Sequence, residues 1–171
     1  DAPVVDLAGS GSAQNYAFSS INENTNQSAE STMSMIINGM STIPVDPDGN
    51  SQGIAIYAVS STGPGNGTWQ TKIDGGAWAD LTGLTTALFL DNNDELKFIP
   101  DGDNGETSTL SFYVWDQYDD TAISSADLQN ILYRGGEFSF SLNEMTTSIE
   151  VTSENDAPVL ASTTSNSSFI E

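Results

Sequence analysis

The chain has 171 residues, with three Lys or Arg against 24 Asp or Glu, a formal net charge of −21, and neither Cys nor His. So acidic a surface repels nucleic acid and anionic membranes, and the missing residue types exclude disulfides, thiolate nucleophiles, imidazole bases and the usual zinc sites. Divalent cations are the natural partners, because Ca²⁺ binds about six to eight oxygen ligands and carboxylates supply them.

The two ends of the chain share a repeated motif. Asp1-Ala2-Pro3-Val4-Val5 recurs as Asp156-Ala157-Pro158-Val159-Leu160, which gives a repeat of 155 residues. We therefore expect residues 1–155 to form one unit and residues 156–171 to be the linker and first strand of the next. The chain opens without Met or a leader, so we expect it to be an internal piece of a longer protein. These 171 residues contain no apolar run of about 20 residues, so we expect no membrane-spanning helix in this piece.

The first half of the chain alternates loops and strands. Residues 8–20 and 60–67 are rich in Gly, Ser and Asn and are predicted to be loops. Residues 54–59 are apolar on both alternating faces, which is typical of a covered central strand. Trp69 and Ile73 share one face of the next strand and are predicted to point into the core. Asp74-Gly75-Gly76 then predicts a tight hairpin leading into Trp78.

The second half continues with strands that are apolar on one face only. The alternating apolar positions are Leu96 and Phe98, then Leu110, Phe112 and Val114, then Phe138, Phe140 and Leu142, and finally Ile149 and Val151. One-sided burial of this kind predicts antiparallel sheets packed as a sandwich. Only residues 124–133 are predicted to be helical, between a capping Ser124 and the Gly135-Gly136 stop.

Several short motifs resemble one family in their order and spacing. They are Ile21-Asn22-Glu23, Asp46-Pro47-Asp48-Gly49, Gly67-Thr68-Trp69-Gln70, Asp74-Gly75-Gly76-Ala77-Trp78, Leu96-Lys97-Phe98-Ile99-Pro100-Asp101, Val114-Trp115-Asp116-Gln117 and the junction Asn155-Asp156-Ala157-Pro158-Val159. Residues 1–160 thereby resemble the cadherin-like repeats found in tandem in giant bacterial adhesins of the repeats-in-toxin type. The resemblance implies an all-β fold, an antiparallel Greek-key β-sandwich with long loops and one short helix, secreted to the bacterial cell surface.

The same resemblance implies calcium at the linkers between neighbouring repeats. It implies that the calcium ligands are acidic and amide side chains that gather at one end of the sandwich: Glu23, Asp46, Asp48, Asp116, Glu154, Asn155 and Asp156. Asp1 would belong to the preceding junction and Glu171 to the following one. The ordinary alternative is that these are turn residues and solvated charges. An EF-hand is excluded, because the loop from Asp46 has Ser51 and Tyr57 where Gly and Glu are required.

Aromatic residues offer a second kind of site, since Trp and Tyr can stack on sugars. Trp78 lies beside the hairpin, and Tyr113 and Trp115 lie opposite the apolar face of their strand. The alternative for Tyr113 and Trp115, which we favour, is burial beneath the helix of residues 124–134.

Two functions follow from these patterns. The leading hypothesis is a calcium-stiffened spacer whose partners are neighbouring repeats, and the second is a domain that binds a glycan or peptide of a host or surface through its extra loops. An enzyme is not expected, because no carboxylate pair stands out as acid and base. Amide crosslinks through Lys72 or Lys97 are not expected either, since both are predicted to lie on polar faces.

Overall fold

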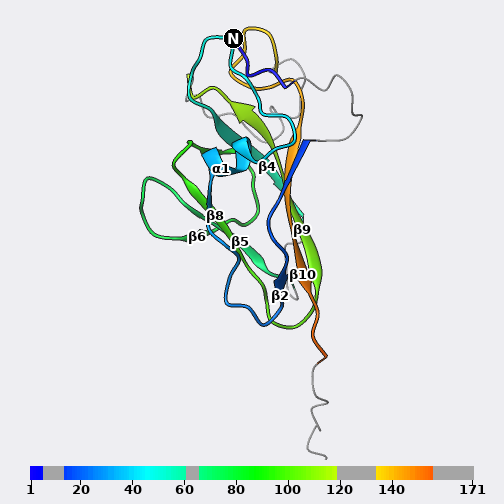
Figure 1. Ribbon diagram of the computed structural model, residues 1–171. Helices are drawn as coiled ribbons and strands as arrows, with labels where there is room; N and C mark the ends of the chain where they lie inside the picture. Colours follow the sequence, from blue (N-terminus) through cyan, green and yellow to red (C-terminus); the bar gives the residue numbers. More distant parts are fainter. Residues whose placement is uncertain (6–13, 61–65, 119–133, 156–171) are drawn as a thin grey trace, which may run out of the picture.

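A computed structural model describes residues 1–5, 14–60, 66–118 and 134–155 (Figure 1). These residues form two β-sheets in an elongated body, with Asp1 at one end and the last strand running out at the other. The all-β class and the two-sheet architecture predicted from the alternating patterns are confirmed. No helix in these ranges is long and apolar enough to cross a membrane.

Ten strands and one short helix make up the described chain. In order they are β1 (Gln14–Ala17), β2 (Ile21–Asn22), β3 (Ser31–Thr32), α1 (Met33–Asn38), β4 (Gly53–Val59), β5 (Thr68–Lys72), β6 (Ala79–Asp80), β7 (Leu88–Leu90), β8 (Glu95–Ile99), β9 (Glu106–Trp115) and β10 (Met145–Thr152).

The larger sheet has the strand order β1-β10-β9-β4-β7, with β2 also paired to β10. Strands β1 and β2 run parallel to β10, whereas the other pairs are antiparallel. Strand β4 therefore lies inside the sheet between β7 and β9, which confirms the prediction of a covered strand. Its register shifts by one residue between Ile56 and Ala58, a bulge that lets the strand bend.

The smaller sheet has the order β3-β8-β5-β6. Its antiparallel ladder pairs Trp69 with Phe98 and Lys72 with Glu95. The side chains that alternate inward from both sheets form the main core, because each sheet can bury only one face against the other. This placement explains why Leu96 and Phe98 are fully buried.

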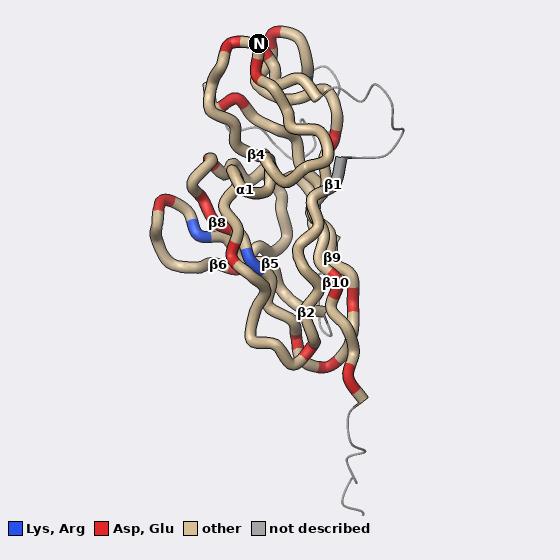
Figure 2. The backbone as a smooth tube through the Cα atoms, in the orientation of Figure 1, with Lys and Arg blue, Asp and Glu red and all other residues tan. Residues whose placement is uncertain are grey.

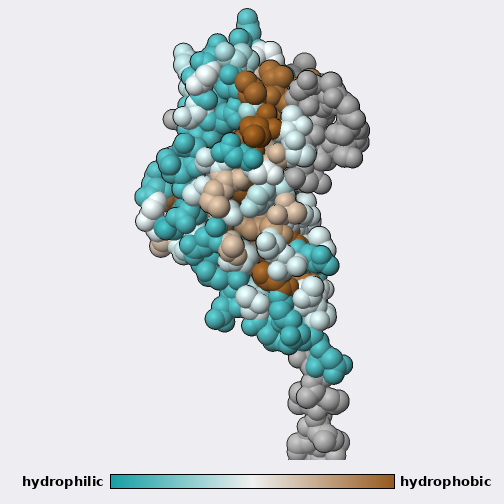
Figure 3. Space-filling model, viewed as in Figure 1, coloured by the Kyte–Doolittle hydropathy of each residue, from teal (hydrophilic) through white to brown (hydrophobic). Residues whose placement is uncertain are grey.

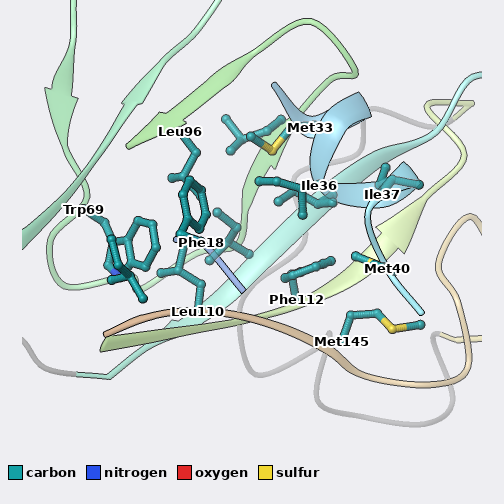
Figure 4. Close-up of a cluster of buried hydrophobic side chains, with 14 of the residues drawn as sticks. Phe18, Met33, Ile36, Ile37, Met40, Trp69, Leu96, Leu110, Phe112 and Met145 are labelled. Carbon is teal, nitrogen blue, oxygen red and sulfur yellow. The ribbon is translucent and has the colours of Figure 1, made fainter. Parts of the chain in front are cut away.

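Trp69 is buried in the main core, as predicted (Figure 4). Its ring packs edge-on against Phe18 and Phe98, and its indole nitrogen donates a hydrogen bond of 2.8 Å to the Ser108 hydroxyl on the facing sheet. The largest side chain of the core thus contacts both sheets and leaves no donor unpaired. The other fully buried large residues are Met33, Ile36, Ile54, Ile56, Leu90, Leu96, Phe98, Leu110, Phe112 and Met145.

Two elements appear where a loop or no regular structure was expected. The loop predicted for residues 8–20 contains β1, which pairs with β10 and precedes the buried Phe18. Helix α1 begins at the cap Thr32, whose hydroxyl accepts a hydrogen bond from the Met35 amide. It buries Met33, Ile36 and Ile37 against the core, so its six residues are stabilised by tertiary packing rather than by length.

Three other predictions differ from the structure. Ile73 is 41% exposed, because β5 ends at Lys72 and Asp74 adopts a positive φ of 51°. Strands β5 and β6 do form the predicted hairpin, but its loop covers residues 73–78, so Trp78 lies in that loop rather than in a strand. Residues 138–142 form no strand: Phe140 makes an isolated bridge to Trp115, while Phe138 and Leu142 are exposed. The predicted helix at 124–133 lies outside the described residues.

Candidate metal sites at both ends and at a lateral turn

Acidic side chains collect at the N-terminal end of the body, where Asp1, Asp46, Asp48 and Asp116 form what we call the Asp46 cluster (Figure 2). The amino group of Asp1 lies 2.7 Å from a carboxylate oxygen of Asp48. This hydrogen bond raises the pKa of the amino group, and the charges of Asp48, Asp116 and Asp46 add to the effect. The carboxylates of Asp48, Asp116 and Asp46 are thus all close enough to act on the amino group of Asp1.

The side chain of Asp46 is buried and holds the loop of residues 46–50 in place by hydrogen bonds. Its Oδ1 accepts hydrogen bonds from the amides of Asp48 and Asn50, at 2.9 and 3.1 Å, which closes the turn. Its Oδ2 is buried and has no hydrogen-bond partner. Asp116, also buried, similarly fixes a turn by accepting from the Tyr118 amide at 2.9 Å. The loop therefore holds one carboxylate oxygen unsatisfied inside the protein.

A second cluster lies at the opposite end, near the end of β10, and we call it the Glu23 cluster. It consists of Glu23, Asp101, Glu106 and Glu154. Glu23 is only 1% exposed, and its Oε1 accepts from the Glu154 amide at 2.7 Å. Strands β2 and β9 both pair with β10 here, so that Glu106 and Ile21 flank Val151.

Three carboxylate oxygens of the Glu23 cluster are buried without a hydrogen-bond partner: Glu23 Oε2, Asp101 Oδ2 and Glu106 Oε2. Burial raises the pKa of Glu106, against a hydrogen bond from the Gly67 amide, and the charge of Asp101 raises it further. A methyl group on the next residue, Gly102, would lie 3.9 Å from the Glu23 carbonyl oxygen, which places the Asp101 turn beside Glu23. Neither Asp101 nor Glu106 was selected as a metal ligand from the sequence.

A third acidic group lies on the side of the body, where the loop after β5 meets the β7–β8 turn. Asp74, Asp91 and Asp94, which we call the lateral triad, bring three carboxylate oxygens within 4.8 Å of one another and could hold a metal ion. Within the ranges that the structure describes, no other set of three does so. Asp94 is 4% exposed and accepts from the amides of Asp74 and Asp91, both at 2.9 Å.

The lateral triad was missed because its members come from different turns. Asp74 follows β5 and Asp94 precedes β8, and the pairing of Lys72 with Glu95 places the two turns side by side. Burial raises the pKa of Asp94, and the nearby charges of Asp91 and Asp74 add to that effect against the two backbone hydrogen bonds. The signal in the sequence was the pair of acidic turns flanking two adjacent strands.

The predicted calcium ligands do not gather at one end. Asp46, Asp48 and Asp116 lie at the N-terminal end with Asp1, whereas Glu23, Glu154 and Asn155 lie at the other. The expectation of a single set is therefore wrong, because β2 and β10 carry their residues away from the loops at the N-terminal end. Asp156 and Glu171 lie outside the described residues.

The candidate sugar-stacking residues are not open platforms. Tyr113 and Trp115 are 3% and 6% exposed, packed with Ala55, Ala87 and Phe140 in a second cluster on the outer face of the larger sheet. Both side chains are thus buried, while the helix that was expected to cover them lies outside the described residues. Trp78 is half-buried, and Lys97 Nζ lies 4.1 Å from the centre of its ring.

Lys72 lies on a polar face as predicted, whereas Lys97 is buried although it occupies a polar position of β8. Lys97 is 7% exposed and its Nζ donates to Gln27 Oε1 at 2.9 Å, with a Glu30 carboxylate oxygen at 3.9 Å. Lys72 forms a 2.7 Å ion pair with Glu95. Lys97 thus packs Trp78 against the smaller sheet.

Comparisons with protein-family models, with curated proteins and with solved structures gave no match for this chain.

Proposed function

We propose that this chain is a calcium-binding repeat of an extracellular bacterial adhesin, a cadherin-like Greek-key sandwich that acts as a rigid spacer in attachment to a surface or host cell. The observation that carries the proposal is the position of the acidic clusters. They lie at opposite ends of an elongated body, and each end holds a buried carboxylate oxygen without a partner, Asp46 Oδ2 at one and Glu23 Oε2 at the other.

The chemistry of both clusters fits a hard cation. A buried carboxylate without a partner is costly, and binding a cation is one way to offset that cost. Ca²⁺ prefers carboxylate and carbonyl oxygens, and the chain has no His or Cys that would favour a softer metal. Glu23, Asp101 and Glu106 would contribute ligands at one end, and Asp46, Asp48 and Asp116 at the other, although neither set alone brings three carboxylate oxygens within 4.8 Å of one another.

Each end offers only part of a ligand set, which suits a junction between two units. In a tandem array the Glu23 cluster of one unit would face the Asp46 cluster of the next. Asp156 is the counterpart of Asp1 in the repeated motif and would join that second cluster. Bound Ca²⁺ supplies the positive charge that cancels the repulsion between the two sets of carboxylates. The linker residues Glu154 and Asn155 then orient the neighbours.

The surface at the N-terminal end also favours contact with a neighbour. A groove of about 460 Å³ is lined there mainly by apolar residues, among them Ala2, Pro3, Val4, Pro47 and Leu142. Val4 and Val45, which pair in an antiparallel bridge, are 54% and 65% exposed. On the face shown in Figure 3, apolar surface gathers near this end. Contiguous apolar surface of this kind commonly marks an interaction site.

Small-angle scattering of a chain with two consecutive units tests the proposal. In calcium we expect a maximum dimension close to the sum of two long axes, and in chelator a shorter and broader distance distribution, because uncompensated carboxylates repel one another. Glu23→Gln in the first unit should reduce the calcium effect. Glu150→Gln, on an exposed position of β10, is the matched control and should leave it unchanged. Equal distributions in both buffers would contradict the spacer function.

A further inference from the structure

A small polar pocket lies where α1, the loop before β4 and the β7–β8 turn meet. Its volume is about 210 Å³, and it is lined by Ser34, Ile37, Asn38, Asn50, Gln52 and Asn92. Five of these six side chains are amides or hydroxyls, and none carries a charge. The pocket is separate from the three acidic groups, although Asn92 shares a turn with Asp91 and Asp94.

Much of the hydrogen-bonding capacity of this pocket is unused. Among the described residues, the side chains of Asn50 and Gln52 have no hydrogen-bond partner. The side-chain oxygen Oδ1 of Asn92 accepts one hydrogen bond, from the Asn93 side chain at 3.2 Å, and its Nδ2 donates none among the described residues. Asn38 is held in place by donating to the Ser34 carbonyl and hydroxyl oxygens, at 2.8 and 3.3 Å. Three amide groups are therefore free to bind a ligand.

The backbone that presents these amides is fixed. The Ser34 amide donates to the Asn92 carbonyl at 3.1 Å, which ties the turn to α1. Asp94 closes the same turn by accepting from the Asp91 amide at 2.9 Å, and Asp46 accepts from the Asn50 amide at 3.1 Å. A ligand would meet a backbone that is already ordered, so binding has to order only the free side chains.

The lining indicates the chemical class of the ligand. Each amide offers a donor and an acceptor, which matches the adjacent hydroxyl groups of a sugar ring, and the buried Ile37 offers an apolar contact. An anion would be repelled by the net charge of −21 and by the carboxylates on the same turn. The volume is below the roughly 300–1,000 Å³ of sites for drug-sized ligands, so it suits one ring.

We propose that this pocket binds a single neutral sugar unit, such as the terminal hexose of a glycan. The proposal is independent of the spacer function, because none of the three free amides belongs to an end cluster.

The test is a titration of the ¹⁵N-labelled chain, in calcium buffer, with glucose, galactose, mannose and, as a charged control, glucuronate. We expect at least one neutral sugar to shift the side-chain amide signals of Asn50, Gln52 and Asn92, with a Kd of the order of 1 mM. Glucuronate should shift none of them. If no neutral sugar moves these signals, or if glucuronate binds equally well, the proposal is overturned.

Variants locate the binding to the pocket. Asn92→Ala and Gln52→Ala should each weaken binding about fivefold or more, since each removes hydrogen bonds to the sugar. Ser51→Ala changes the loop between two lining residues without touching the lining and should bind like the parent chain. The backbone signals of the core report whether each variant is folded. Equal affinity of Asn92→Ala and Ser51→Ala would overturn the assignment, whatever the tandem scattering shows.

Discussion

The interior between the two sheets and the two ends of the molecule treat buried polar groups in opposite ways. In the interior, Trp69 is 1% exposed and donates to Ser108, whose hydroxyl in turn donates to the Ser60 carbonyl at 3.0 Å. The Thr147 hydroxyl is an exception there, buried without a partner. At the ends Glu23, also 1% exposed, leaves a carboxylate oxygen unsatisfied, and Asp46 does the same.

This difference separates the interior, which stabilises the fold under all conditions, from the ends, whose contribution to stability depends on metal and pH. The interior depends on apolar burial and on a hydrogen bond whose two partners are both present, so salt or metal should affect it little. A buried carboxylate keeps its cost until a proton or a cation reaches it. The ends should therefore respond to calcium and pH, and the four predictions that follow are ordered by the size of the effect.

The largest effect is expected in the interior. Trp69→Ala removes the central ring of the core and leaves the Ser108 hydroxyl without its donor, so it should lower the free energy of unfolding by about 3–5 kcal/mol. Urea denaturation followed by circular dichroism measures this loss. The loss should be similar in calcium and in chelator, because Trp69 is not in either end cluster.

Trp78→Ala is the matched control for that variant. Trp78 is half-buried and contacts Lys97 and Lys72 through its ring, at 4.1 and 5.8 Å. Losing these contacts should cost about 0.5–1 kcal/mol beyond the area lost, much less than Trp69→Ala. Equal costs for the two variants would show that the interior is not organised around Trp69.

Calcium should give the next largest effect, acting on the ends. At a calcium concentration about 100 times the Kd, binding to the folded state alone adds about 2.7 kcal/mol per site. For a chain of this length that is a rise of about 5–10 °C in Tm. Thermal melts with calcium and with chelator at neutral pH measure it. Identical melting temperatures in calcium and in chelator would show that calcium does not bind to the ends of the folded chain.

Neutralising a single buried carboxylate should change the free energy of unfolding in opposite directions in chelator and in calcium. Glu23→Gln and Asp46→Asn each remove a buried charge while keeping an oxygen that can accept the backbone hydrogen bond. In chelator each should stabilise the fold by about 1 kcal/mol, and in calcium each should reduce the metal-dependent gain. Glu150→Gln, an exposed change of the same type, should stay within about 0.5 kcal/mol in both. A destabilising effect of Glu23→Gln in chelator would mean that its carboxylate needs no cation.

The sequence was sufficient for the interior because side-chain alternation records burial directly. The phase of Trp69 and the pattern of Leu110, Phe112 and Val114 predicted which faces meet. It was insufficient where burial has another cause. Lys97 sits at a polar position of β8 and is nonetheless buried, because Gln27 and the Trp78 ring cover it.

The ends were predictable in residue type but not in position. Glu23 and Asp46 were both selected as metal ligands, yet alternation gives no information on which end of a strand a loop occupies. That depends on strand order, and the parallel pairing of β2 with β10 is a contact between residues far apart in the chain. The lateral triad was missed for the same reason, since Asp74 and Asp94 meet only through the β5–β8 pairing.

The smallest predicted effect is a pH dependence of the metal-free protein. Burial raises the pKa of Asp94 and of Glu106 in the folded state, above ordinary values of 3.8 and 4.5. The folded chain therefore binds more protons than the unfolded chain between those values and the raised ones, and stability should fall as pH rises through this window.

Because other carboxylates titrate in this window too, the informative quantity is the difference in Tm between the parent chain and each variant. In chelator, Asp94→Asn and Glu106→Gln should each make the fall in Tm from about pH 4 upward less steep, whereas Glu150→Gln should not. Calcium should reduce the slope of the parent chain as well, if the same carboxylates bind it. A parent chain whose Tm follows the same pH profile as both variants would show that these two carboxylates are solvated. For Glu106, it would also show that its end of the molecule does not differ from the interior in the way described.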